Sequence, residues 1–149
     1  MTEHMAQVVA LFEAFVHRQP MRAVEEVQAI ADKGFERCIH GRPGSRRQVL
    51  LMGSETLEQL GLTPGAVKEN VTTRGLALND LREGQRLRVG GALLEVTVPC
   101  HPCNRMDEIR PGLQDELRGR RGLLCRIIEG GRIRCGDTIM ALEFMRVGS

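Results

Sequence analysis

Residues 123–142 read LLCRIIEGGRIRCGDTIMAL, and this stretch carries the strongest indication of fold in the chain. Apolar residues dominate 123–129 (LLCRIIE) and alternate with polar ones through 132–135 (RIRC), with Gly130-Gly131 between the two runs. Two adjacent glycines can supply the positive φ values of a tight turn, so the pattern predicts a β-hairpin. Gly136-Asp137 then predicts a second turn, which leads into a further apolar strand.

A similar pattern lies upstream, where QRLRV (85–89) and ALLEVTV (92–98) flank Gly90-Gly91. This is a second hairpin signal of the same kind. The apolar run VLLM (49–52) predicts a short buried strand, and residues 24–31 form a plausible strand with partial alternation.

The other segments add little regular structure. Residues 5–16 fit helical spacing and strand composition equally well. GFERCIHGRPGSRR (34–47) is a loop rich in Gly, Pro and Arg, and Ser54 reads as the N-cap of a short helix. Residues 67–81 are too polar to be core, and 113–118 fit one or two helical turns. The sum predicts a mainly β fold, built as a barrel or closed sheet with a few short helices.

Composition narrows the class of protein. The chain has 149 residues, which suits a single domain over 1–149. A formal charge of +2 with no Trp or Tyr argues against a nucleic-acid partner. The longest apolar stretch, VVALFEAFV (8–16), contains Glu13 and is followed, not preceded, by basic residues, so we expect no signal peptide and no membrane partner. A cytoplasmic protein with reduced cysteines is the expectation, and the sequence leaves the oligomeric state open.

A pair of thiols in VPCHPCNRMD (98–107) is the main candidate for chemistry. CxxC supplies half of a tetrahedral zinc site, although no second CxxC completes it. A dithiol redox pair is a second interpretation, although the surrounding βαβ pattern is missing. The third is a single reactive thiolate at Cys103, with Arg105 favouring the charged form and Cys100 ending the preceding strand.

Clustered arginines form a second candidate feature. They occur in the first loop and just before 123–142, and loop arginines can clamp a phosphate, although a solvated surface has the same composition. The residues are Arg42, Arg46, Arg47, Arg118, Arg120 and Arg121.

Together these pieces resemble the MOSC domain, which is found at the C-terminus of molybdenum-cofactor sulfurases and as stand-alone bacterial proteins. The resemblance covers about residues 20–142 and rests on the order and spacing of several weak motifs. These are RRQVLLM, LTPGAVKENVTTRGLALNDLREGQRLRVGGALLEVTVPCHPCNRM and GRRGLLCRIIEGGRIRCGDTI. One departure is GFERCIH (34–40), where Arg37 and Cys38 replace the Gly and Asp found in many members.

The resemblance implies a MOSC-type β-barrel and a functional cysteine at Cys103, which in sulfurases carries sulfur as a persulfide. The expected partner is a cysteine desulfurase or a molybdoenzyme maturation protein, and the expected cofactor is molybdenum cofactor. Pyridoxal phosphate is expected on the partner, because it needs a Schiff-base lysine and the two lysines here sit in no recognisable site. The expected cofactor contacts, predicted to share one concave surface with the Cys103 sulfur, are Asn70, Lys68, Arg47, Arg105 and Arg121.

Two alternatives remain open. One is a molybdenum-dependent reductase component acting on N-hydroxylated compounds, with molybdenum bound by Cys103. The other is a non-catalytic module that binds zinc or a small anion. The roles of Cys38, Cys100, Cys125 and Cys135 are not specified by the pattern.

Overall fold

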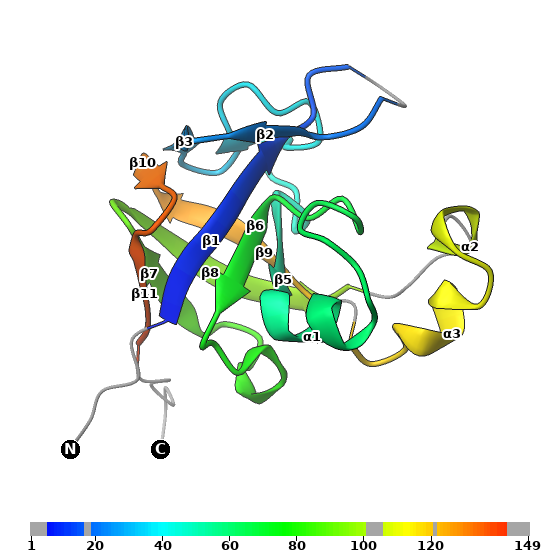
Figure 1. The fold of residues 1–149 in the computed structure, drawn as a ribbon. Coiled ribbons are helices and arrows are strands. Elements are labelled where there is room, and N and C mark those ends of the chain that lie inside the picture. Colours follow the sequence, from blue (N-terminus) through cyan, green and yellow to red (C-terminus); the bar gives the residue numbers. More distant parts are fainter. Residues whose placement is uncertain (1–5, 17–18, 101–105, 121, 143–149) are drawn as a thin grey trace.

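A computed structural model describes residues 6–16, 19–100, 106–120 and 122–142. Within them the predicted mainly β fold is confirmed: seven strands close into a barrel in the order β11-β7-β8-β9-β5-β6-β1, with β1 pairing back onto β11 (Figure 1). An eighth strand, β2, extends this sheet beyond β1. The strands are β1 (Ala6–Glu13), β2 (Arg22–Val24), β5 (Val49–Gly53), β6 (Val71–Arg74), β7 (Arg86–Val89), β8 (Ala92–Pro99), β9 (Leu123–Glu129) and β11 (Thr138–Ala141).

A smaller three-stranded sheet lies beside one part of the barrel. Its order is β10 (Gly131–Arg134), β3 (Glu26–Ile30) and β4 (Gly34–Phe35). The helices of the described residues are short: α1 (Ser54–Gln59), the 3₁₀ turn η1 (Leu78–Asp80), α2 (Met106–Ile109) and α3 (Leu113–Glu116). Figure 1 shows α1 near the ends of β5 and β6, with α2 and α3 to one side of the barrel.

The barrel encloses the main core, and a second apolar cluster covers the outside of β5. Every residue of β5 is buried, because Leu51 faces the barrel interior while Met52 faces the outer cluster. Packing on both faces explains why VLLM is a continuous apolar run without alternation. The outer cluster consists of Met52, Leu57, Val67, Met106, Leu113 and Leu117.

The hairpin predicted at Gly90-Gly91 is confirmed. β7 and β8 pair antiparallel, with Val89 opposite Ala92 across the two-residue turn. Gly90 has a φ of 54°, in the left-handed region that favours glycine.

The hairpin predicted at Gly130-Gly131 is wrong. β9 pairs with β5 and β8 in the barrel, whereas β10 pairs with β3 in the smaller sheet. Neither glycine has a positive φ, so no tight turn forms there. Both are instead sites of close backbone approach: a Cβ on Gly131 would overlap the carbonyl oxygen of Gly91, and one on Gly130 would lie 2.7 Å from the Ala29 oxygen.

Other local predictions change in detail. The ambiguous N-terminal segment is strand β1, and the single strand predicted over 24–31 is replaced by β2 and β3. The helix predicted after Ser54 begins at that residue, with Gly53 as its N-cap and no side-chain cap. Ser54 is buried, so its position is set by packing of the β5 end and not by capping.

The segment 67–81, predicted as too polar for the core, is buried over 67–73 apart from Lys68, and is half-buried or exposed from Arg74 onward. Residues 69–73 and Val67 are inaccessible or nearly so. The prediction failed because Glu69 Oε2, the Thr72 hydroxyl and the Asn70 amide find internal partners, although Glu69 Oε1 and the Thr73 hydroxyl have none among the described residues.

Candidate functional site

The thiol-bearing stretch leaves the barrel at the end of β8. Pro99 pairs with Leu123 at the start of β9, and the Cys100 N–H donates to the Gly122 carbonyl at 3.0 Å. Gly122 has a φ of 111°, and a Cβ there would overlap the Leu51 carbonyl oxygen. Glycine is thus required where the thiol strand meets the barrel wall. The predicted site residues Cys103, Arg105 and Arg121 lie outside the described residues.

A cleft opens at this end of the barrel. Its volume is about 500 Å³, and it lies where the parallel strands β5 and β6 end. Gly53 and Gly122 form part of its wall, and Arg120 is the single cation among its described lining residues. Glu55 also lines it, with a carboxylate that accepts the Gly75 N–H at 2.7 Å. The Gly122 wall therefore joins this cleft directly to the thiol strand.

The KEN segment (68–70) presents one lysine and buries its two neighbours. Lys68 is exposed and adopts a φ of 64°, which is costly for a residue with a Cβ. It lines a groove of about 460 Å³ that is otherwise uncharged among the described residues. Apolar side chains form most of the groove, and exposed Ile109 of α2 stands on its edge. Strained non-glycine residues of this kind occur at functional sites.

Glu69 and Asn70 hold that lysine in place from within. Glu69 is fully buried, and its Oε2 accepts the Gly65 N–H and the Thr72 hydroxyl, both at 2.8 Å. The Asn70 amide bridges two strands: Oδ1 accepts the Leu50 N–H at 2.9 Å, and Nδ2 donates to the Phe12 carbonyl at 3.3 Å. Asn70, predicted as a cofactor contact on the concave surface, is only 4% accessible and lines neither the cleft nor the groove.

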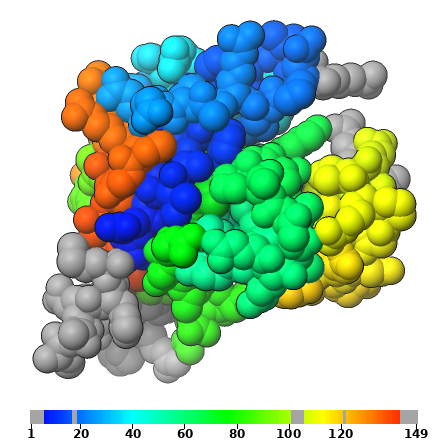
Figure 2. Space-filling model, viewed as in Figure 1, coloured from blue at the N-terminus to red at the C-terminus, as the bar shows by residue number. Residues whose placement is uncertain are grey.

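The outer apolar cluster brings the thiol stretch and the KEN segment together. Met106, the first described residue after Cys103, belongs to the same buried cluster as Val67, which precedes Lys68. Figure 2 shows the segment that begins at Met106, in yellow, lying against the green surface of the α1 region. Residues about forty positions apart in sequence thus meet beside the Lys68 groove.

Arg47 is the predicted arginine contact that lies within the described residues, and it lines neither cavity. Arg47 is exposed, and its N–H donates to the Ser45 hydroxyl at 2.9 Å. Arg120, which belongs to the basic run but was not predicted as a contact, is the arginine that lines the cleft. Arg120 lies two residues before Gly122, the glycine that must approach the barrel wall. That spacing is the sequence signal that could have identified Arg120 as a residue of the cleft.

Apart from Cys100, the described cysteines occupy three separate environments. Cys125 lies in the barrel core, where burial raises the pKa of its thiol to about 12. Cys135 is partly exposed, and its pKa is raised by burial and then by nearby Glu25. Cys38, at the position of the family's Asp, is buried with its sulfur 3.4 Å from the Ala14 nitrogen and 3.5 Å from Asn70 Nδ2. Among the described residues no three His, Cys, Asp or Glu side chains cluster as metal ligands.

The fold defines a small β-barrel protein, with one cleft where β5 and β6 end and a separate, mostly apolar groove beside Lys68. A model of the MOSC domain matches residues 37–140. The chain therefore belongs to the MOSC family, which is associated with the molybdenum cofactor. No curated protein matches the chain.

Solved structures show the same fold. The YuaD protein from Bacillus subtilis has a TM-score of 0.81 and 20% identity, over 95% of this chain and 97% of that one. YiiM from Geobacillus stearothermophilus has a TM-score of 0.73 and 23% identity, over 93% and 75%. YiiM from Escherichia coli has a TM-score of 0.69 and 18% identity, over 97% and 72%. Within the residues described here, no helix is both long and apolar enough to span a membrane.

Proposed function

We propose that this chain carries sulfur for the molybdenum cofactor through the thiolate of Cys103. The observation that supports it best is the bond between the Cys100 N–H and the Gly122 carbonyl, which places the start of the thiol stretch against the cleft wall. At the other end of that stretch, Met106 belongs to the cluster beside the Lys68 groove. Cys100 and the helix that begins at Met106 thus each adjoin a cavity that has one cation among its described lining residues.

The proposed transfer is a thiolate displacement. The Cys103 thiolate attacks the outer sulfur of a persulfide on a cysteine desulfurase, a new S–S bond forms at Cys103, and the desulfurase cysteine leaves as a thiolate. Oxidation states balance, because sulfane sulfur only changes its carrier. Nearby cations favour the reactive thiolate, and Arg105 and Lys68 are the proposed sources of that field.

The molybdenum cofactor is the proposed acceptor of the sulfur, bound as a substrate through its anionic groups. The Lys68 groove suits such a molecule: its volume lies within the usual range for ligand sites, its walls are mostly apolar, and it offers one ammonium group. Arg120 and its neighbour Arg121 are proposed to serve the cleft in the same way. Asn70 acts from beneath, by fixing the backbone that presents Lys68.

Two cysteine variants test the carrier role. After incubation with a cysteine desulfurase and cysteine, Cys103→Ser should form no persulfide, while Cys100→Ser should keep most of it. Mass spectrometry of the trapped protein measures both. Equal loss in the two variants would instead indicate a dithiol or zinc site.

Lysine variants test the groove. Lys68→Met should weaken binding of molybdenum cofactor by about 1–3 kcal/mol, the range for charge-assisted hydrogen bonds, and Lys68→Arg should keep most of the affinity. Lys33, the only other lysine, is the matched control because its ammonium donates to the Phe35 and Glu36 carbonyls and does not line the groove. Unchanged affinity in Lys68→Met would remove the groove from the proposal.

Elemental analysis of freshly purified, anaerobically handled protein separates the alternatives. The carrier should contain labile sulfur, with molybdenum only when cofactor is supplied. Stoichiometric molybdenum that disappears in Cys103→Ser would favour the reductase component, and stoichiometric zinc would favour the binding module.

A further inference from the structure

β8 contains a break in register just before the thiol stretch. Val96 lies opposite Cys125 on β9, but the next pair is Val98 with Leu124. Two steps on β8 therefore match one step on β9, which makes Thr97 the extra residue of a β-bulge.

The bulge reverses the faces of the strand. Before it, the even-numbered residues Leu94 and Val96 point into the barrel core. After it, Val98 shares a face with Leu124, which lies outside that core cluster, and Pro99 pairs with inward-facing Leu123. If the alternation continues past Pro99, which is exposed at the end of the strand, it places Cys100 on the outer face. A regular strand would have turned Cys100 into the core, because a one-residue slip moves every following side chain to the opposite face.

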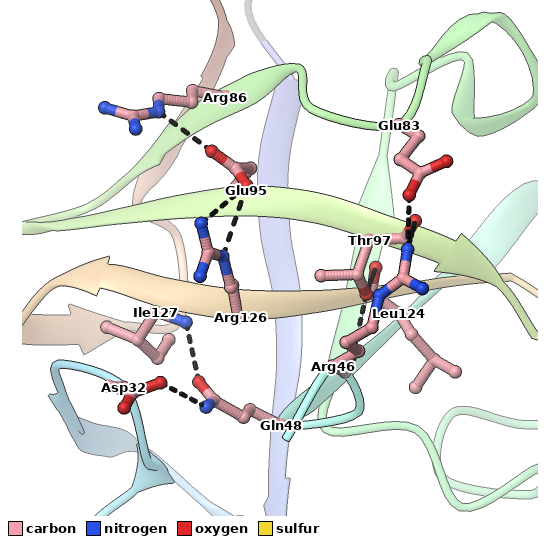
Figure 3. Close-up of polar contacts among 10 residues, drawn as sticks. All are labelled: Asp32, Arg46, Gln48, Glu83, Arg86, Glu95, Thr97, Leu124, Arg126 and Ile127. Carbon is pink, nitrogen blue, oxygen red and sulfur yellow. Dashed lines mark hydrogen bonds and ion pairs between the residues drawn. The ribbon is translucent and has the colours of Figure 1, made fainter. Parts of the chain in front are cut away.

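Side chains from two other segments hold this bulge, as Figure 3 shows. Thr97 is 4% exposed, and its hydroxyl lies within hydrogen-bonding distance of two carbonyl oxygens, Leu124 O at 2.9 Å and Arg46 O. The Arg46 guanidinium returns a bond to the Thr97 carbonyl at 3.4 Å and is paired with Glu83. The loop before β5 is therefore fastened to the bulged residue from outside the barrel.

Backbone bonds fix the residue on the near side of the bulge. The Val96 N–H donates to the Gln85 carbonyl and the Gly84 N–H donates to the Val96 carbonyl, both at 2.8 Å. Nearby, Arg126 and Glu95 form an ion pair with a nitrogen–oxygen distance of 3.0 Å. Both residues line a groove of about 350 Å³ that Arg46 and Thr97 also line. No described contact joins Arg126 to Thr97, so the side-chain contacts at the bulged residue come from Thr97 and Arg46.

We infer that Thr97 and Arg46 are positioning residues, which hold the β8 bulge and thereby direct Cys100 to the outer face of the barrel. This inference deepens the proposed carrier role, but it concerns the direction of the strand and is testable without cofactor or desulfurase.

The test is native-state alkylation of Cys100, measured per cysteine by peptide mass spectrometry in a Cys103→Ser background. Cys125, buried with a raised thiol pKa, reports unfolding in the same sample. Deletion of Thr97 should restore a regular strand, turn Cys100 inward and slow its labelling by at least about tenfold. Thr97→Val, which keeps the shape and removes the hydroxyl, should slow it by roughly fivefold, the effect of one lost hydrogen bond. Thr97→Ser should restore the wild-type rate.

Arg46→Gln should resemble Thr97→Val, whereas the matched control Arg126→Gln should label like wild type. If the deletion variant does not fold, as fast Cys125 labelling would reveal, the three point variants decide. Unchanged or faster Cys100 labelling in Thr97→Val, with Cys125 still protected, would overturn the inference, because the hydroxyl would then only stiffen the strand. Failure of persulfide transfer with normal labelling would count against the carrier role alone.

Discussion

The two Gly-Gly pairs have the same sequence and opposite structural roles. Gly90-Gly91 closes a hairpin, and Gly90 is needed for its positive φ. Gly130-Gly131 has no positive φ and marks the point where the chain leaves the barrel for the smaller sheet. The two pairs also touch: the Gly91 N–H donates to the Arg132 carbonyl at 2.9 Å, and Gly131 packs on the Gly91 carbonyl. Glycine is thus required for a dihedral angle in one place and for missing volume in the other.

The largest effect is expected for Gly131→Ala. The added methyl would overlap the backbone of Gly91, which no side-chain rotation can relieve, so the free energy of unfolding should fall by about 3 kcal/mol or more. Urea denaturation measures it. Gly112→Ala is the control, because its φ of 86° is unfavourable but nothing lies within 4 Å of the new methyl. A loss for Gly131→Ala no larger than for this control would contradict the volume explanation.

A thiol on β9, the strand that ends just before Gly130-Gly131, should make the folded protein less stable at alkaline pH. Cys125 on β9 has its thiol pKa raised by burial from 9.0 to about 12, so the folded state keeps a proton that the unfolded state releases. The contribution of this thiol to the free energy of unfolding is intact below pH 9 and is lost as the pH rises from 9 to about 12. At pH 11 the loss should be about 2–3 kcal/mol. The free energy of unfolding, measured by urea denaturation at pH 8, 9, 10 and 11, tests this. Cys125→Ala should be less stable at pH 8 but show a shallower decline, and parallel declines would disprove the assignment.

A smaller loss is expected for Gly90→Ala. The cost comes mainly from the positive φ, about 1–2 kcal/mol, because the nearest atom belongs to the Asp137 side chain, which can move, and the Arg132 carbonyl oxygen lies 3.2 Å from the new methyl. Gly90→Asn should cost less, since Asn tolerates this conformation better. Thermal unfolding compares the two variants. An Ala variant as unstable as Gly131→Ala would mean that contact and not dihedral angle governs both pairs.

The smallest effect has the opposite sign. Lys68 has a glycine-like φ without being glycine, so Lys68→Gly should gain about 1 kcal/mol of stability while losing affinity for anionic ligands. Lys68→Ala should show the same loss of affinity with no comparable gain. Calorimetric unfolding and ligand titration give the two readouts. A Gly variant that is less stable than wild type would show that the lysine side chain contributes packing that offsets its strain.

The amino-acid sequence was sufficient for features that depend on neighbouring residues. The alternation in 85–98, with Gly90 able to adopt a positive φ, specifies a hairpin locally, and the order and spacing of the motifs are enough to indicate the MOSC family. The run 49–52 was recognisable as a buried strand for the same reason. The KEN motif also pointed to Lys68, which the structure leaves exposed beside a groove.

Only the tertiary structure decided which distant groups meet. The pairing of β9 with β5 and β8, and of β10 with β3, depends on ladder partners far away in sequence, so the second glycine pair could not be read correctly from its own pattern. Glu69 and Asn70 looked too polar for a core because their partners on Gly65, Leu50 and Phe12 are invisible to local composition. A polar group is buried where folding supplies its hydrogen bonds, and that supply is a property of the assembled barrel.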